Sequence, residues 1–96
     1  NIKIEGENRK GLEIQIRTIN DSDVLWTKGY KIGRKSWVGP GQHSLSVMCV
    51  FKFSWGTEMK PGSVEVNAVA GKKYKITLAN KANLQAKECN VSVSEA

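Results

Sequence analysis

The sequence predicts an all-β domain, built as an antiparallel β-sandwich of seven to eight strands. Apolar and polar residues alternate through most of the 96-residue chain, which is typical of strands with one buried face. No window keeps the i, i+3, i+4, i+7 spacing over the roughly ten residues that a helix needs. Turn-forming residues recur about every 8 to 12 residues, a spacing that favours a sandwich, with a closed barrel as the alternative.

The chain is expected to form a single domain, residues 1–96, because a chain of this length buries too little apolar surface for a second core. Its composition, 40% hydrophobic and 25% charged, is that of an ordinary globular protein. No apolar run reaches the roughly 18 to 20 residues that span a bilayer. Any signal peptide or lipid-attachment cysteine would lie upstream of Asn1, and a membrane contact is expected only through such an anchor.

Two alternating strands are expected at the start of the chain. Residues 2–4 begin the first, and residues 12–18 carry apolar or β-branched side chains at every second position of the next. The polar segment 6–11 separates them. The Asn, Asp and Ser cluster at 20–23 ends the second strand, because these side chains hydrogen-bond to their own backbone.

The middle of the chain contains the longest predicted strand. Residues 24–32 alternate around a glycine that marks a bulge or a close backbone approach. Residues 36–38 form a short extended piece before Gly39-Pro40-Gly41, the strongest turn signal. The following strand, 43–53, has a core face made of His43, Leu45, Val47, Cys49, Phe51 and Phe53.

Shorter elements complete the predicted sandwich. Residues 55–62 hold a turn signal at each end and are expected to form a loop before the strand 64–68. The segment 70–73 turns the chain into the strand 74–78, and a last strand is expected within 84–93. The outer face of the strand at 74–78 is lined by Lys73, Lys75 and Thr77.

Cys49 and Cys89 are the two cysteines, and both fall on the apolar face of their predicted strands. A disulfide between sheets or neighbouring strands is the favoured interpretation, and it indicates an exported protein. Two buried, unpaired thiols are the first alternative. A metal site shared with His43 is the second, and it is disfavoured because zinc sites use closely spaced ligand pairs.

No catalytic residue, cofactor or metal site is predicted. His43 is the sole histidine and starts a strand directly after a turn, at the rim of the sandwich. Cys49 lies about 20 Å further along the same extended strand, so these two residues cannot form a nucleophile and base pair. Asp21 and Asp23 are interpreted as turn residues, because a calcium loop needs more oxygen ligands at regular spacing. No phosphate-binding glycine loop occurs.

The formal net charge of +6 permits anionic partners. The segment 26–37 combines aromatic and basic residues, which could stack on bases and neutralise phosphates. Trp26 and Tyr30, however, share their strand face with apolar neighbours, which places them in the core. Tryptophans in or beside loops better suit a contact with a protein or a glycan. The predicted contact surface consists of Trp37, Trp55, Lys31, Arg34 and Lys35.

Two motifs carry a family resemblance: Gly39-Pro40-Gly41-Gln42-His43-Ser44-Leu45-Ser46-Val47 and Ala70-Gly71-Lys72-Lys73-Tyr74. The chain resembles small bacterial envelope domains, including periplasmic lipoproteins of unknown function and PEGA-like modules. In those domains Pro-Gly-x-His-x-Leu-x-Val and Ala-Gly-Lys-x-Tyr open strands. The resemblance covers about half of the chain. It implies an immunoglobulin-like or transthyretin-like sandwich in the periplasm or on the cell surface, without catalytic residues.

We therefore expect a non-catalytic exported module of the bacterial cell envelope, the soluble part of a lipoprotein, that acts through protein–protein contacts. Its partner would be an unidentified protein or envelope component, and strand addition at a sheet edge is one available mode. The alternative is binding of nucleic acid or another polyanion through residues 26–37. The sequence does not indicate an oligomeric state.

Overall fold

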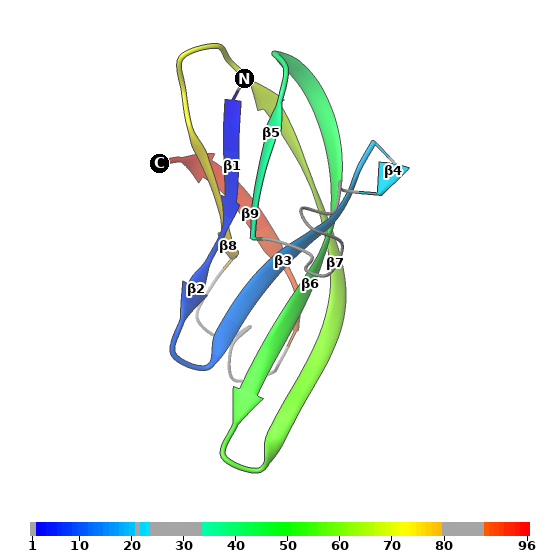
Figure 1. The fold of residues 1–96 in the computed structure, drawn as a ribbon, viewed down its shortest axis with the longest axis vertical. Coiled ribbons are helices and arrows are strands. Elements are labelled where there is room, and N and C mark those ends of the chain that lie inside the picture. Colours follow the sequence, from blue (N-terminus) through cyan, green and yellow to red (C-terminus); the bar gives the residue numbers. More distant parts are fainter. Residues whose placement is uncertain (1, 21, 24–33, 80–87) are drawn as a thin grey trace, which may run out of the picture.

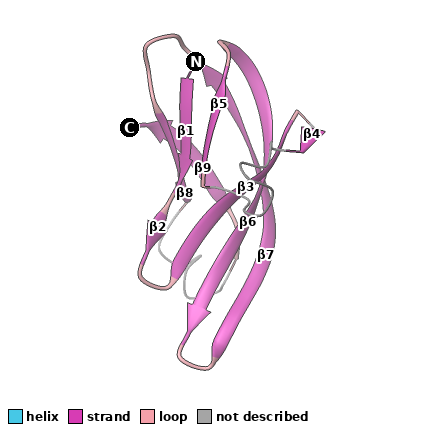
Figure 2. Ribbon diagram, in the orientation of Figure 1, coloured by secondary structure: helices cyan, strands magenta, loops and turns pink. Residues whose placement is uncertain are grey.

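The computed structural model describes residues 2–20, 22–23, 34–79 and 88–96, and strands are the only regular elements in them (Figures 1 and 2). The predicted strand at 24–32, with Trp26, Tyr30 and Lys31, lies outside these residues, as do residues 84–87. The strands are β1 (Ile2–Gly6), β2 (Asn8–Arg9), β3 (Leu12–Ile19), β4 (Ser22–Asp23), β5 (Lys35–Val38), β6 (Gly41–Phe53), β7 (Gly56–Ala68), β8 (Tyr74–Leu78) and β9 (Val91–Glu95).

Two sheets form the sandwich. The first has the order β5-β1-β8-β9, and the second has the order β2-β3-β6-β7, with the two-residue β4 paired to β3. Counted without β4, eight strands of the described residues make up the two sheets, which confirms the predicted β-sandwich. The strands pair antiparallel except β1 and β8, which run parallel.

The apolar faces of both sheets meet in one core. On β6 the predicted core face is confirmed between Leu45 and Phe51, while His43 and Phe53 at its two ends are partly exposed. Burial of each large aliphatic or aromatic side chain contributes about 1.5 to 3 kcal/mol. The largest fully buried side chains are Phe51, Ile4, Leu12, Ile14, Ile16, Leu45 and Ile76.

Gly6 is the point where the chain passes from the first sheet to the second. Its N–H donates to the Arg34 carbonyl at 2.6 Å, and the N–H of Glu7 donates to the Ile76 carbonyl at 2.9 Å. The Glu7 carbonyl in turn accepts from the Ile14 N–H at 2.8 Å, so the backbone of Glu7 joins the two sheets. A Cβ atom on Gly6 would overlap the Ile14 carbonyl, so this crossing requires glycine.

Residues 55–62 do not form the predicted loop, because β6 and β7 pair continuously from Gly41–Ala68 to Phe53–Gly56. The turn between them is only Ser54 and Trp55. The Pro61-Gly62 turn signal is accommodated because β7 lies at the edge of its sheet. A proline there loses no ladder hydrogen bond if its nitrogen points outward.

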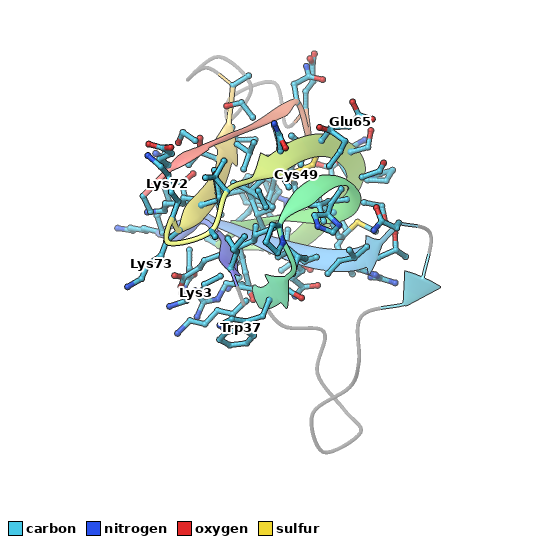
Figure 3. The ribbon with its side chains drawn as sticks, turned by 90° about the horizontal axis from the view of Figure 1, so that it is seen from above. Lys3, Trp37, Cys49, Glu65, Lys72 and Lys73 are labelled. Atoms are coloured by element: carbon cyan, nitrogen blue, oxygen red, sulfur yellow. A yellow bond between two sulfur atoms is a disulfide. The ribbon has the colours of Figure 1, made fainter. Side chains whose placement is uncertain are left out.

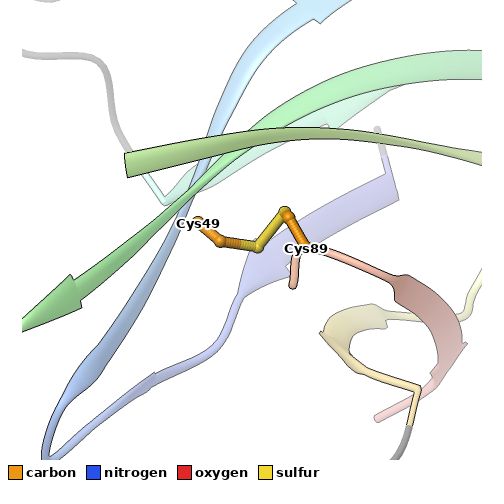
Figure 4. Close-up of a disulfide and its surroundings, with 2 residues drawn as sticks. All are labelled: Cys49 and Cys89. Atoms are coloured by element: carbon orange, nitrogen blue, oxygen red, sulfur yellow. A yellow bond between two sulfur atoms is a disulfide. The ribbon is translucent and has the colours of Figure 1, made fainter. Parts of the chain in front are cut away.

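Cys49 and Cys89 form a disulfide, which confirms the predicted pairing (Figure 4). Their Cα atoms are 5.6 Å apart, and 40 positions separate them in the sequence. Cys49 belongs to β6 of the second sheet, whereas Cys89 lies just before β9 of the first. The bond therefore links the two sheets. The last strand starts at Val91, within the predicted segment 84–93, and extends beyond it to Glu95.

Candidate functional site

The register of the first sheet gathers charged residues on its outer surface. Alternate residues of β1, β5 and β8 are buried, so the residues between them point outward. Lys3 lies opposite Trp37, and Glu5 lies between Lys35 and Lys75. We call this outer surface the lysine face, and it consists of Lys3, Glu5, Lys35, Trp37, Lys73 and Lys75.

Lys73 joins this surface from the residue before β8. It lies beside Lys3, because the next residue, Tyr74, is the register partner of Ile4. Figure 3 shows Lys3, Lys73 and Trp37 along one side of the sandwich, away from Cys49.

The lysine face is hollowed between its strands. A depression of about 310 Å³ is lined by four of its residues and by Arg34, which lies just before β5. The depression therefore has basic walls. The lysine-face residues that line it with Glu5 are Lys3, Lys73 and Lys75.

Glu5 is the one carboxylate of the lysine face. Its Oε1 lies 3.7 Å from the Lys3 Nζ, and its Oε2 lies 3.6 Å from an Arg34 nitrogen. Arg34 is also 3.8 Å from Glu13 of the second sheet. These ion pairs are long and about a third exposed, so they contribute little to the free energy of unfolding.

The positive charge of the lysine face is only partly neutralised by Glu5. Lys35, Lys73 and Lys75 have no ion-pair partner within the described part of the chain. Elsewhere, lysines at positions 52, 60 and 72 pair with glutamates, and Lys10 and Arg17 are isolated exposed charges. The lysine face is thus a concentrated source of positive potential.

Trp37 adds an aromatic surface to this charge. Its side chain is 56% exposed on the edge strand β5, directly opposite Lys3. An indole offers a large apolar area together with one N–H donor, a combination that suits protein interfaces. Charge and aromatic area therefore occur together on this sheet.

Within the described residues, neither a metal site nor a membrane-spanning helix competes with the lysine face. In the residues described above, no three His, Cys, Asp or Glu side chains gather where they could hold a metal ion. The same residues contain no helix long and apolar enough to cross a membrane. No family model, curated protein or solved structure matches the chain.

The predicted contact residues are distributed over two places. Trp37 and Lys35 belong to the lysine face, and Arg34 borders it, whereas Lys31 lies outside the described residues. Trp55 is 80% exposed in the β6–β7 turn and stacks on Phe53, with ring centroids 5.0 Å apart. Figure 1 places that turn at the far end of the molecule from the β5–β6 connection.

Sequence reasoning did not include Lys3, Lys73 and Lys75 in the contact surface. Alternation in 73–77 indicates a lysine-lined strand, but it does not show which strand lies next to it. The parallel pairing of β1 with β8 brings the three lysines together. No short-range signal in the sequence reports such a pairing.

His43 has a structural role at the rim of the second sheet. A ring protonated on Nε2 satisfies both contacts, since Nε2 donates to the Gly39 carbonyl at 2.7 Å and Nδ1 accepts from the Asn20 amide at 3.0 Å. The Asn20 Oδ1 accepts the backbone N–H of Ser44 at 2.9 Å. The imidazole thus holds the turn before β6 against the end of β3.

Proposed function

We propose that this domain is a non-catalytic binding module of the bacterial cell envelope that docks a partner protein on its lysine face. The unneutralised group of Lys35, Lys73 and Lys75 beside the exposed indole of Trp37 carries this proposal. Interface energy commonly concentrates on a few residues such as tryptophan, while charged neighbours orient the partner. The complementary surface is acidic and has an apolar area that covers Trp37.

Glu5 favours a protein over a nucleic acid as the partner. Glu5 lies between Lys35 and Lys75 in the sheet, and its carboxylate is 3.7 Å from the Lys3 Nζ. A phosphodiester chain crossing this surface would bring its own negative charges close to Glu5, and like charges in an interface are unfavourable. A folded protein can place a hydrogen-bond donor or a cation at that point.

The disulfide supports an exported location. Cytosolic thiols are kept reduced, whereas the periplasm and the cell surface allow structural disulfides to persist. The resemblance to envelope lipoproteins supports attachment through a lipidated cysteine upstream of the domain.

The proposal is tested by titrating the chain with an acidic peptide of alternating Glu and Leu residues and with a single-stranded oligonucleotide of equal charge. Amide chemical-shift changes should map to β1, β5 and β8 with the peptide. The peptide should also bind more tightly than the oligonucleotide. Binding of both ligands should weaken as salt is raised, because exposed charges are screened.

Two variants with the same net charge give the matched comparison. Replacing Lys35, Lys73 and Lys75 with Gln should lower peptide affinity about tenfold, if each lysine contributes about 0.5 kcal/mol. Replacing Lys10, Arg17 and Lys60 with Gln should have a much smaller effect. Equal losses in both variants, or tighter binding of the oligonucleotide, would reject a protein-docking lysine face.

A further inference from the structure

Within the described residues, the backbone groups on the outer edge of β9 have no partner. The N–H of Ala79 donates to the Asn90 carbonyl and that of Ala96 donates to the Lys73 carbonyl, both at 2.8 Å. Even-numbered residues of this segment therefore direct their backbone toward β8. The N–H and C=O groups of Val91, Val93 and Glu95 point away from β8, and no backbone group in the described residues bonds to them.

The edges of β7 and β5 are less suited to strand pairing. In β6, the backbone groups of Ser44 and Lys52 bond toward β3, and those of Met48 point the same way because it is also an even-numbered residue. Pro61 faces Met48 across the β6–β7 pair, so its nitrogen points to the outer edge of β7. Proline there removes a donor from the middle of that edge. The edge of β5 spans only Lys35–Val38 and includes a lysine. In contrast, β9 contains neither proline nor lysine.

Side chains at this edge are incompletely covered. Val91 and Val93 point to the core side and pack against it, but both are only partly buried. Gly62 and the disulfide lie next to the start of this strand. A further strand beside β9 would remove more of the two valines from water and satisfy the outward backbone groups.

We infer that a second copy of this chain pairs with β9, antiparallel to it, around a twofold axis at Val93. The sequence Val-Ser-Val-Ser-Glu is complementary to itself in this register. Val93 faces its symmetry mate, Val91 faces Glu95 of the other copy, and all three outward-directed residues find partners. Each of these three residue pairs exchanges two hydrogen bonds, about six in total.

The charges of the segment agree with this register. The two copies of Glu95 lie at opposite ends of the paired strands, so like charges do not face each other. Each Glu95 is also 3.0 Å from Lys72 of its own chain. Such an interface is isologous, in which the same surface patch meets itself.

The dimer goes beyond the proposed function and does not depend on it. The added strand lies at the edge of the first sheet opposite β5, which leaves Trp37 and the lysines free. The twofold axis of an antiparallel pair is perpendicular to the sheet. Both lysine faces therefore lie on the same side of one continuous eight-stranded sheet.

Sedimentation equilibrium of the native chain, up to millimolar concentration, tests the inference. We expect a monomer–dimer equilibrium that Val93→Pro abolishes and Val93→Ala retains. The Val93 N–H points outward, so the proline removes an intermolecular donor and no bond to β8. A native chain that stays monomeric, or a folded Val93→Pro variant that still dimerises, would overturn the proposed pairing.

A cross-link provides a second measurement that does not require the proline variant to fold. Facing residues in a hydrogen-bonded antiparallel pair have Cα atoms about 5.5 Å apart, which suits a disulfide. The Val93→Cys variant should therefore form a covalent dimer in air, with the bond at position 93 identified by peptide mapping. The Ser94→Cys variant, away from the axis, should not. Equal cross-linking of both variants would contradict the register.

Discussion

Gly62 of β7 lies directly against Cys89. A Cβ atom at position 62 would stand 2.6 Å from the Cys89 carbonyl oxygen and 2.7 Å from its Sγ. Gly62 pairs with Val47, two residues from the other disulfide partner, Cys49. The missing side chain thus leaves the space through which the bond connects the two sheets.

Replacing Gly62 with Ala should destabilise the domain. The added methyl group must displace the backbone of Cys89 or the disulfide, and such overpacking costs about 1 to 3 kcal/mol. Urea denaturation without reductant measures the loss. Gly39→Ala is the control, because a Cβ at position 39 meets no atom within 4 Å. Equal stability of the two variants would show that the space beside Cys89 is not limiting.

Reduction of the Cys49–Cys89 bond should have a larger effect. In the chain-entropy model, a bond that closes a loop of 40 residues stabilises the folded state by roughly 4 kcal/mol. This is a large part of the stability of a small domain. The midpoint of urea denaturation should fall strongly when reductant is added. For a Cys49→Ala/Cys89→Ala variant, the midpoint should be the same with and without reductant. An unchanged midpoint for the native chain would rule out this stabilising role.

The alternation of residues 43–53 predicted the core face of β6 from Leu45 to Phe51, and the inward positions of both cysteines predicted the partner of Cys49. A two-residue period reports which face of a strand is buried, and two inward cysteines in one small core have few other partners. The same alternation does not report which strands are neighbours. The parallel contact of β1 with β8, and with it the grouping of Lys3 with Lys73 and Lys75, depends on the tertiary structure.

Pro61-Gly62 was misleading for a physical reason. Proline and glycine are strong turn signals because of their backbone geometry. At the edge of a sheet a proline with an outward nitrogen is tolerated, and here the glycine is required by Cys89. Both residues therefore lie inside a strand of thirteen residues. Sequence reasoning could not separate these cases without knowing that β7 is an edge strand.

The stability of the domain should depend on which residue replaces Asn20. Its φ angle is 52°, in the left-handed region that non-glycine residues rarely occupy. Asn20→Gly and Asn20→Ala both remove the side-chain contacts to His43 and Ser44, but only alanine has to adopt this conformation with a Cβ. Asn20→Ala should be the less stable variant by about 1 kcal/mol. Thermal denaturation of the two proteins measures this difference, and an inverted order would contradict the left-handed backbone.

Glu5→Gln should increase the affinity of the lysine face for a polyanion. The substitution removes the one carboxylate between Lys35 and Lys75 and keeps the size of the side chain. A single exposed charge interaction is worth about 0.5 to 1 kcal/mol, so the affinity for a single-stranded oligonucleotide should rise about threefold at low salt. Fluorescence anisotropy of a labelled oligonucleotide measures the change.

Glu58→Gln is the matched control for this experiment, because it changes the net charge equally. Glu58 lies on β7 and pairs with Lys60 at 3.3 Å, in the other sheet. If the oligonucleotide binds wherever the chain is positive, both substitutions should raise its affinity alike. If it binds on the lysine face, only Glu5→Gln should do so. A selective response would show that Glu5 limits nucleic-acid binding there, as expected of a surface suited to a protein.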